Sequence, residues 1–227
     1  MFKNFMSFLQ GKDFLSQILD DFNKMLKDTQ NMFKSVLNKL MESKEKPGLK
    51  DEIYSVDKQV NKLEREIRKR IVEHLSLQPT VDVPACLVMM SVVKDAERIG
   101  DYCKNLYEVT ELLKKPLDKA GFRKLFDDID KEIVGEFSKT MRAFRESDEK
   151  LAKEVLAIES AIVKKCDGIL KELASGVLGT NEAVCYTLTA RYFKRISAHL
   201  ANIGSSVILP VSDLDFFDEK LRREKIK

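Results

Sequence analysis

Oxygen-bearing side chains gather in the segment DAERIGDYCKNL, which covers residues 95–106. If this segment is an α-helix, in which successive residues are rotated by about 100°, Glu97, Asp101, Asn105 and Glu108 fall within about one quadrant. The apolar side chains fall on the opposite side: Val92, Ala96, Ile99, Cys103 and Leu106. The carboxylates and amides therefore line an outer stripe of the helix rather than its core face.

Carboxylates four residues apart on a helix lie about 6 Å from one another, close enough to share or bridge a hard cation. The preceding segment carries Asp57, Asn61 and Glu64 along the edge of its apolar face, so we expect these oxygens to meet the stripe across a seam. Oxygen-rich groups suit magnesium, calcium, manganese or iron rather than zinc held by thiolates. The alternative is an ordinary solvated face on which Lys94 and Arg98 neutralise the acids as ion pairs.

No sequence pattern for catalysis accompanies these acids. The chain contains no G-x-x-x-x-G-K-[ST], G-x-G-x-x-G, H-E-x-x-H or G-x-S-x-G, and neither His74 nor His199 has a candidate nucleophile beside it. The four cysteines are widely spaced with no C-x-x-C pair, which favours free buried thiols. We predict no catalytic residue and a protein that is not an enzyme.

The composition is typical of amphipathic helices joined by short turns, with 44% hydrophobic and 34% charged residues, 9 Gly, 5 Pro and no Trp. A net charge of +3, with interleaved signs, argues against a nucleic-acid partner. No apolar run approaches the roughly 20 residues that cross a bilayer. The first residues do not resemble a secretory signal, so a cytoplasmic location is expected.

Apolar residues recur at steps of three and four, which predicts six long helices. They are expected over about residues 14–40, 53–71, 83–115, 122–147, 149–174 and 181–207. Pro47 and Gly48 mark the first turn, and Asp82 is predicted to cap the third helix, with Pro84 in its first turn. A lone helix of this kind is barely stable in water, so each apolar stripe must be buried against partners.

The order of the segments repeats. Aligning residues 53–67 with 155–169 places Asp57 on Glu159, and aligning ERIGDYCKNL (97–106) with KRISAHLANI (194–203) matches Arg98 to Arg195 and Asn105 to Asn202. Such a duplication predicts an all-α fold of two tandem three-helix bundles, over residues 1–115 and 116–210, followed by a tail at 211–227.

The second copy of the motif departs from the first. It has Lys194, Ser197 and Ala198 where the first has Glu97, Gly100 and Asp101, and Tyr192 where the first has Asp95. A protonated lysine cannot ligate a cation and alanine offers no donor. If metal binds, we expect one site per chain, in the first bundle.

The segment ERIGDYCKNL resembles the signature helix of the PhoU family, in which an E-R-I-G-D core with a following Asn recurs once per bundle. The resemblance extends over about residues 10 to 210. It implies a cytoplasmic, homodimeric regulator that restrains phosphate uptake, associates with a phosphate transporter and a sensor histidine kinase, and holds iron or other metal ions. By this resemblance the best ligand candidates are Glu97 and Asp101, with Asp57 and Asn61 as partners and Asn105 as the following Asn.

Two other functions stay open at this point. One is a carboxylate-bridged iron protein for storage or redox chemistry, although ferritin-like proteins place Glu-x-x-His pairs inside the bundle, whereas both histidines of this chain lie away from the acidic stripe. The other is a metal-free scaffold that docks a transporter. The apolar N-terminal residues and the basic residues from Lys220 to Lys227 leave peripheral membrane association open as well.

Overall fold

The computed structural model describes residues 13–42, 47–176 and 178–214, and within these ranges the chain is all-α, as predicted. The helices are α2 (Asp13–Glu42), α3 (Leu49–Leu77), α4 (Val83–Leu112), α5 (Lys119–Phe126), α6 (Ile129–Glu146), α7 (Glu149–Ser175), α8 (Thr180–Ser205) and the short 3-10 helix η1 (Val211–Asp213). None of the helices in this described part combines the length and apolar character that crossing a bilayer requires. The apolar N-terminal residues and the basic residues from Lys220 onward, where the sequence leaves membrane contact open, lie outside the described ranges.

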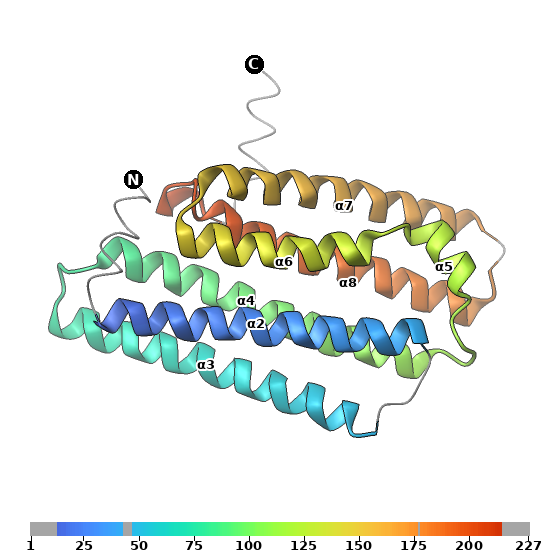
Figure 1. Cartoon of the computed structure of the whole chain (residues 1–227), viewed down its shortest axis with the longest axis horizontal. Helices are drawn as coiled ribbons and strands as arrows, with labels where there is room; N and C mark the ends of the chain where they lie inside the picture. Colours follow the sequence, from blue (N-terminus) through green and yellow to red (C-terminus); the bar gives the residue numbers. More distant parts are fainter. Residues whose placement is uncertain (1–12, 43–46, 177, 215–227) are drawn as a thin grey trace, which may run out of the picture.

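The helices form two three-helix bundles that lie side by side, as the duplication predicts (Figure 1). Helices α2, α3 and α4 pack against one another in the first bundle, and α6, α7 and α8 do so in the second. The two bundles meet mainly through α4 and α8, with α2 and α6 as a second contact. The predicted division at residue 115 falls in the connection between α4 and α5.

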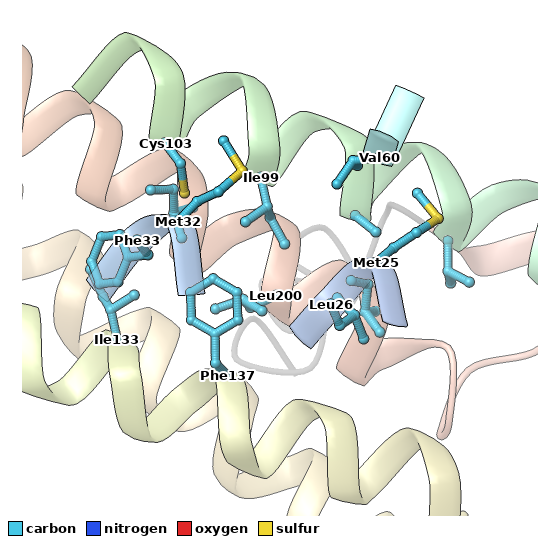
Figure 2. Close-up of a cluster of buried hydrophobic side chains, with 14 of the residues drawn as sticks. Met25, Leu26, Met32, Phe33, Val60, Ile99, Cys103, Ile133, Phe137 and Leu200 are labelled. Carbon is cyan, nitrogen blue, oxygen red and sulfur yellow. The ribbon is translucent and has the colours of Figure 1, made fainter. Parts of the chain in front are cut away.

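The apolar core runs without interruption through both bundles (Figure 2). The Phe33 ring of α2 lies 5.8 Å from the Phe137 ring of α6, centroid to centroid. Ile99 of α4 and Leu200 of α8 are fully buried in the same cluster. Because side chains of both bundles pack into one buried cluster, the two bundles stabilise one another.

The single helix predicted over residues 122–147 is wrong, because the structure breaks it into α5 and α6. Asp127 adopts a left-handed backbone with φ 52° at the break. The Arg123 guanidinium holds the bend, donating to the Asp127 carbonyl oxygen at 2.9 Å and to the Asp130 carboxylate at 2.9 Å. The apolar period continues on both sides of the bend, so periodicity alone does not reveal it.

The predicted N-cap position of Asp82 is confirmed, but the capping hydrogen bond does not form. Asp82 directly precedes α4 with a left-handed backbone, φ 61°, and its side chain caps no backbone N–H. Its carboxylate instead lies 3.2 Å from Nε2 of His74 at the end of α3. Pro84 does occupy the first turn of α4, and Gly48 has φ 76°, a conformation that glycine adopts without the strain of a side chain.

The predicted end of the third helix at Lys115 is three residues too late, since α4 ends at Leu112. The Asn181 side chain, at the start of α8, donates to the Leu112 carbonyl oxygen at 2.9 Å and accepts from the Lys114 N–H at 3.0 Å. These two bonds satisfy backbone groups that a longer helix would have paired internally. They also fasten the end of the first bundle to the second.

Candidate functional site

The predicted acids lie along the seam between α3 and α4, which are neighbours in the first bundle. Asp57 of α3 is buried at the edge of its apolar face, and Asp101 of α4 is partly exposed. Both carboxylates accept a hydrogen bond from the Lys104 ammonium, Asp57 at 3.1 Å and Asp101 at 3.0 Å. The structure thus brings Asp57 and Asp101 together, with a cationic side chain between them.

Glu97 lies one turn before Asp101 on α4, and its side chain is only 16% exposed. Burial raises the pKa of Glu97 to about 7, and the negative charge of Asp101 contributes to the rise. Glu64 and Asp57 add smaller effects of the same sign, whereas Arg98 lowers the pKa. These four carboxyls therefore form one electrostatically coupled group, in which Glu97 is protonated in a large fraction of molecules at neutral pH.

Basic side chains already neutralise part of this group. The Arg98 guanidinium lies 3.2 Å from Asp101 and 3.6 Å from Glu97. Arg98 therefore forms the ion pairs that the alternative of a solvated face requires. Lys94 instead pairs with Asp95 at 3.2 Å. Burial alone would lower the pKa of Lys104, but its hydrogen bonds to Asp101 and Asp57 outweigh burial and the pKa is raised.

Lys104 is the residue of the site that sequence reasoning missed. Its spacing of three residues from Asp101 was a signal for an ion pair within the helix. The contact with Asp57 depends on how α3 packs against α4, which the sequence does not specify. Lys104 therefore became visible as part of the site only once the seam was in place.

The chemistry of the residues fits a hard cation, although they are not arranged as a ready ligand set. The Oδ1 atom of Asp57 is buried without a hydrogen-bond partner, which leaves a carboxylate oxygen able to accept a cation. Asn61 and Asn105 are partly exposed on the same two helices, and neither side chain bonds to the acids in the described ranges. Within those ranges no three acidic, histidine or cysteine side chains are grouped closely enough to hold a metal. A metal at this seam would therefore have to displace the Lys104 ammonium.

The second copy of the motif has different contacts. The Lys194 ammonium, at the position equivalent to Glu97, donates to Asp167 of α7 at 2.6 Å. His199 and Asn202 of α8 turn toward the first bundle, where Nδ1 of His199 lies 2.7 Å from Asp95 and the Asn202 amide donates to Asp95 at 3.0 Å. Asp95 has no exposed surface. The second motif therefore contributes to the contact between bundles.

Aromatic side chains extend this contact between α4 and α8. The Tyr102 ring stacks on the His199 ring at 5.6 Å and lies 5.9 Å from the Tyr192 ring. The Tyr102 hydroxyl accepts a hydrogen bond from Nε of Arg195 at 3.1 Å. The two motif helices thus pack against each other along the line that joins the bundles.

Comparison with known proteins agrees with the duplication. The chain matches the family model described as PhoU domain twice, over residues 22–110 and 126–207. The "Phosphate-specific transport system accessory protein PhoU homolog" of Pseudomonas putida is 26% identical over 186 residues, which cover 78% of this chain and 71% of that protein. The protein of the same description from Pseudomonas aeruginosa is 26% identical over 188 residues, covering 78% and 76%.

Two solved structures share the fold. The crystal structure of PhoU from Pseudomonas aeruginosa superposes with a TM-score of 0.75 at 22% identity, covering 86% of this chain and 95% of that chain. That of the phosphate transport system regulatory protein PhoU from Streptococcus pneumoniae gives 0.76 at 16% identity, covering 85% and 92%. Both support the arrangement of two tandem bundles.

Proposed function

Since this chain belongs to the PhoU family, we propose that it regulates phosphate uptake and phosphate-starvation signalling, and that it does so by binding rather than by turning over a substrate. The observation that carries the proposal is the family match to each bundle. The relatives at 26% identity are described as accessory proteins of a phosphate-specific transport system. Under this proposal the protein is a cytoplasmic homodimer that binds a phosphate transporter and a sensor histidine kinase.

We further propose that the seam between α3 and α4 holds a divalent cation such as iron or magnesium. Asp57 and Asp101 would bind it, with Glu97, Asn61 and Asn105 as the remaining oxygen donors. Binding would exchange one cation for another, because the Lys104 ammonium now lies between the two aspartates. It would also release the proton that burial favours on Glu97. The coupled charges of these carboxyls support the proposal, since like charges held close together favour a cation between them.

The regulatory proposal is tested by deleting the gene in its native host. We expect deranged phosphate uptake and an altered starvation response, both restored by the intact gene. Phosphate uptake and a starvation reporter that are unchanged by the deletion would overturn the proposal.

The metal proposal is tested by elemental analysis of the purified protein beside an Asp101→Ala variant. Asp167→Ala is the matched control, because it removes a comparable ion-paired carboxylate from the second bundle. We expect metal in the wild type and in the control, and a lower metal content in Asp101→Ala. Equal metal content in all three proteins would refute the site.

A metal-free scaffold is the second candidate, and the position of Lys104 favours it. An ammonium that already bridges Asp57 and Asp101 satisfies much of their charge without any metal. Negligible metal in the wild type, together with a regulatory phenotype, would support this candidate. The iron-storage alternative has no comparable support, since His74 and His199 contact Asp82 and Asp95 rather than the acids of the seam.

A further inference from the structure

A carboxyl group lies buried inside the second bundle with only a serine hydroxyl close to it. Glu136 of α6 has no exposed surface, and within the described ranges neither of its carboxyl oxygens makes a hydrogen bond of good geometry, although the Ser197 hydroxyl lies near. The hydroxyls of Thr140, one turn further along α6, and of Ser197 on α8 are fully buried and equally unpartnered. Folded proteins leave very few buried polar atoms in this state, and a bound water or ion is one of the ways in which those that remain are satisfied.

Ser197 lies beside Glu136, and Thr140 belongs to the same side of α6. Glu136 and Thr140 are four residues apart and therefore lie on the same side of α6. The Ser197 hydroxyl lies close enough to the Glu136 carboxyl to favour its charged form. The Glu136 carboxyl and the Ser197 hydroxyl thus meet between α6 and α8, and the buried Thr140 hydroxyl lies one turn away on the same side of α6.

In the corresponding region of the first bundle the buried hydroxyl has a hydrogen-bond partner. Gly100 is the counterpart of Ser197 in the repeat, and a Cβ at Gly100 would lie 3.5 Å from Cγ2 of Thr29 on α2. The Thr29 hydroxyl donates to the Leu26 carbonyl oxygen at 3.0 Å, so it needs no other partner. The second bundle thus has the Glu136 carboxyl and the Ser197 hydroxyl in a region where the first bundle has a hydrogen-bonded Thr29 and Gly100.

The charges around Glu136 favour a cation. Burial raises the pKa of Glu136 well above its usual value, and the nearby carboxylates of Glu159 and Glu132 contribute to the rise. Glu132 is already paired with the Lys165 ammonium at 2.7 Å. Glu159, the α7 counterpart of Asp57, adds a second carboxyl near Glu136. In the absence of a cation, burial favours the protonated form of Glu136 and outweighs the opposing effect of the Ser197 hydroxyl.

We propose that Glu136, Thr140 and Ser197, with Glu159 beside them, form an interior site for a hard divalent cation in the second bundle. Carboxyl and hydroxyl oxygens are ligands that such ions prefer, and two carboxylates balance a charge of two. On binding, the Glu136 carboxylic acid becomes a carboxylate and its proton passes to solvent. The second repeat, which lacks the outer acids, thus has an inner acidic site. The proposal goes beyond the regulatory function and does not rest on it.

The probe is Mn²⁺, added to the full-length chain in an Asp101→Ala background that disables the outer site. Binding is followed by electron paramagnetic resonance and by calorimetry in two buffers of different ionisation heat, which counts the released protons. Because the site is enclosed, the protein is equilibrated with Mn²⁺ at length before measurement. We expect binding in this background together with proton release.

Adding Glu136→Gln keeps the shape of the side chain and removes the charge, so the protein should fold while Mn²⁺ affinity falls by more than about tenfold. Ser197→Gly, which copies the first repeat, should also weaken binding. Glu154→Gln is the matched control, because Glu154 is a partly exposed α7 acid that pairs with Lys139, and it should leave binding unchanged. Equal affinity in Glu136→Gln and Glu154→Gln would overturn the proposal. So would the absence of Mn²⁺ binding in the Asp101→Ala background, which would leave Glu136 as a protonated carboxyl only.

Discussion

Replacing Asp95 with alanine should be among the most damaging single changes at the contact between the two bundles. Asp95 of α4 has no exposed surface, and its carboxylate is held by His199 at 2.7 Å and by Asn202 at 3.0 Å, both from α8. The alanine variant leaves Nδ1 of His199 and the Asn202 amide without their acceptor, in a place that water does not reach. The cost therefore includes both the lost bonds and the stranded polar groups.

The magnitude follows from these contacts. Hydrogen bonds to a charged group contribute about 1.5–3 kcal/mol each, and removing one partner of a buried charged pair costs about 3–5 kcal/mol. Lys94 adds little, because its side chain is 40% exposed and the pair is screened by solvent. We expect Asp95→Ala to lower the free energy of unfolding by about 3–5 kcal/mol, a large share of the roughly 5–15 kcal/mol that is typical of a folded domain.

Urea unfolding followed by circular dichroism measures this loss. The matched control is Asp21→Ala, which removes a partly exposed aspartate that pairs with Arg70 at 2.7 Å within the first bundle, and it should cost less than about 1 kcal/mol. In a double-mutant cycle, Asp95→Ala with His199→Ala should cost clearly less than the sum of the two single changes. A loss for Asp95→Ala no larger than that of the control, or strictly additive effects, would refute this reasoning.

Three further predictions concern the seam and the core. The pKa of Glu97 is raised to about 7, so the folded state keeps a proton that the unfolded state releases near the ordinary pKa of 4.5. This contribution to stability is complete below about pH 4.5 and is lost as the pH rises through 7. Glu97→Gln should therefore flatten the decline of the urea midpoint across that window, and identical slopes in both proteins would contradict it. Lys104→Met should lower the free energy of unfolding of the metal-free protein by about 2 kcal/mol, since it leaves Asp57 and Asp101 without their cation. It should also tighten Mn²⁺ binding in a titration, and unchanged affinity would show that Lys104 does not compete with metal. Phe137→Ala should cost about 3–5 kcal/mol in a single unfolding transition, because the core is continuous through both bundles, whereas two separate transitions would indicate bundles that unfold independently.

The fold was predictable because every long helix shows a three- and four-residue apolar period along its sequence. The bend between α5 and α6 was not, since it depends on how the Arg123 guanidinium reaches Asp127 and Asp130. The left-handed backbone at Asp82 was missed for a similar reason. Its carboxylate lies against His74, a partner from the preceding helix that a local capping rule does not consider.

The candidate site was predictable in part. Helical geometry alone placed Glu97 and Asp101 on one stripe, and the apolar edge of α3 placed Asp57 across the seam. The competition from Lys104 depends on packing and could not be read from spacing. Glu136 did leave a signal in the sequence, because it falls in the apolar period of its helix, three residues after Ile133. A carboxyl at such a position is buried, and a buried carboxyl needs a partner.

The divergence of the two motifs has a structural reason at the contact between α4 and α8. His199 is the counterpart of Tyr102, and Tyr192 is the counterpart of Asp95, so the pair Asp95–His199 in one half of the contact corresponds to the pair Tyr192–Tyr102 in the other.

Two identical copies would place an aspartate against a tyrosine in both halves, and neither buried carboxylate would have its imidazole partner. Divergence instead gives one half a charged, hydrogen-bonded contact, with 2.7 Å between Asp95 and His199. The other half has an aromatic contact, with 5.9 Å between the rings of Tyr102 and Tyr192. The second motif therefore could not repeat the aspartate and the tyrosine of the first at positions 192 and 199 and still form this contact.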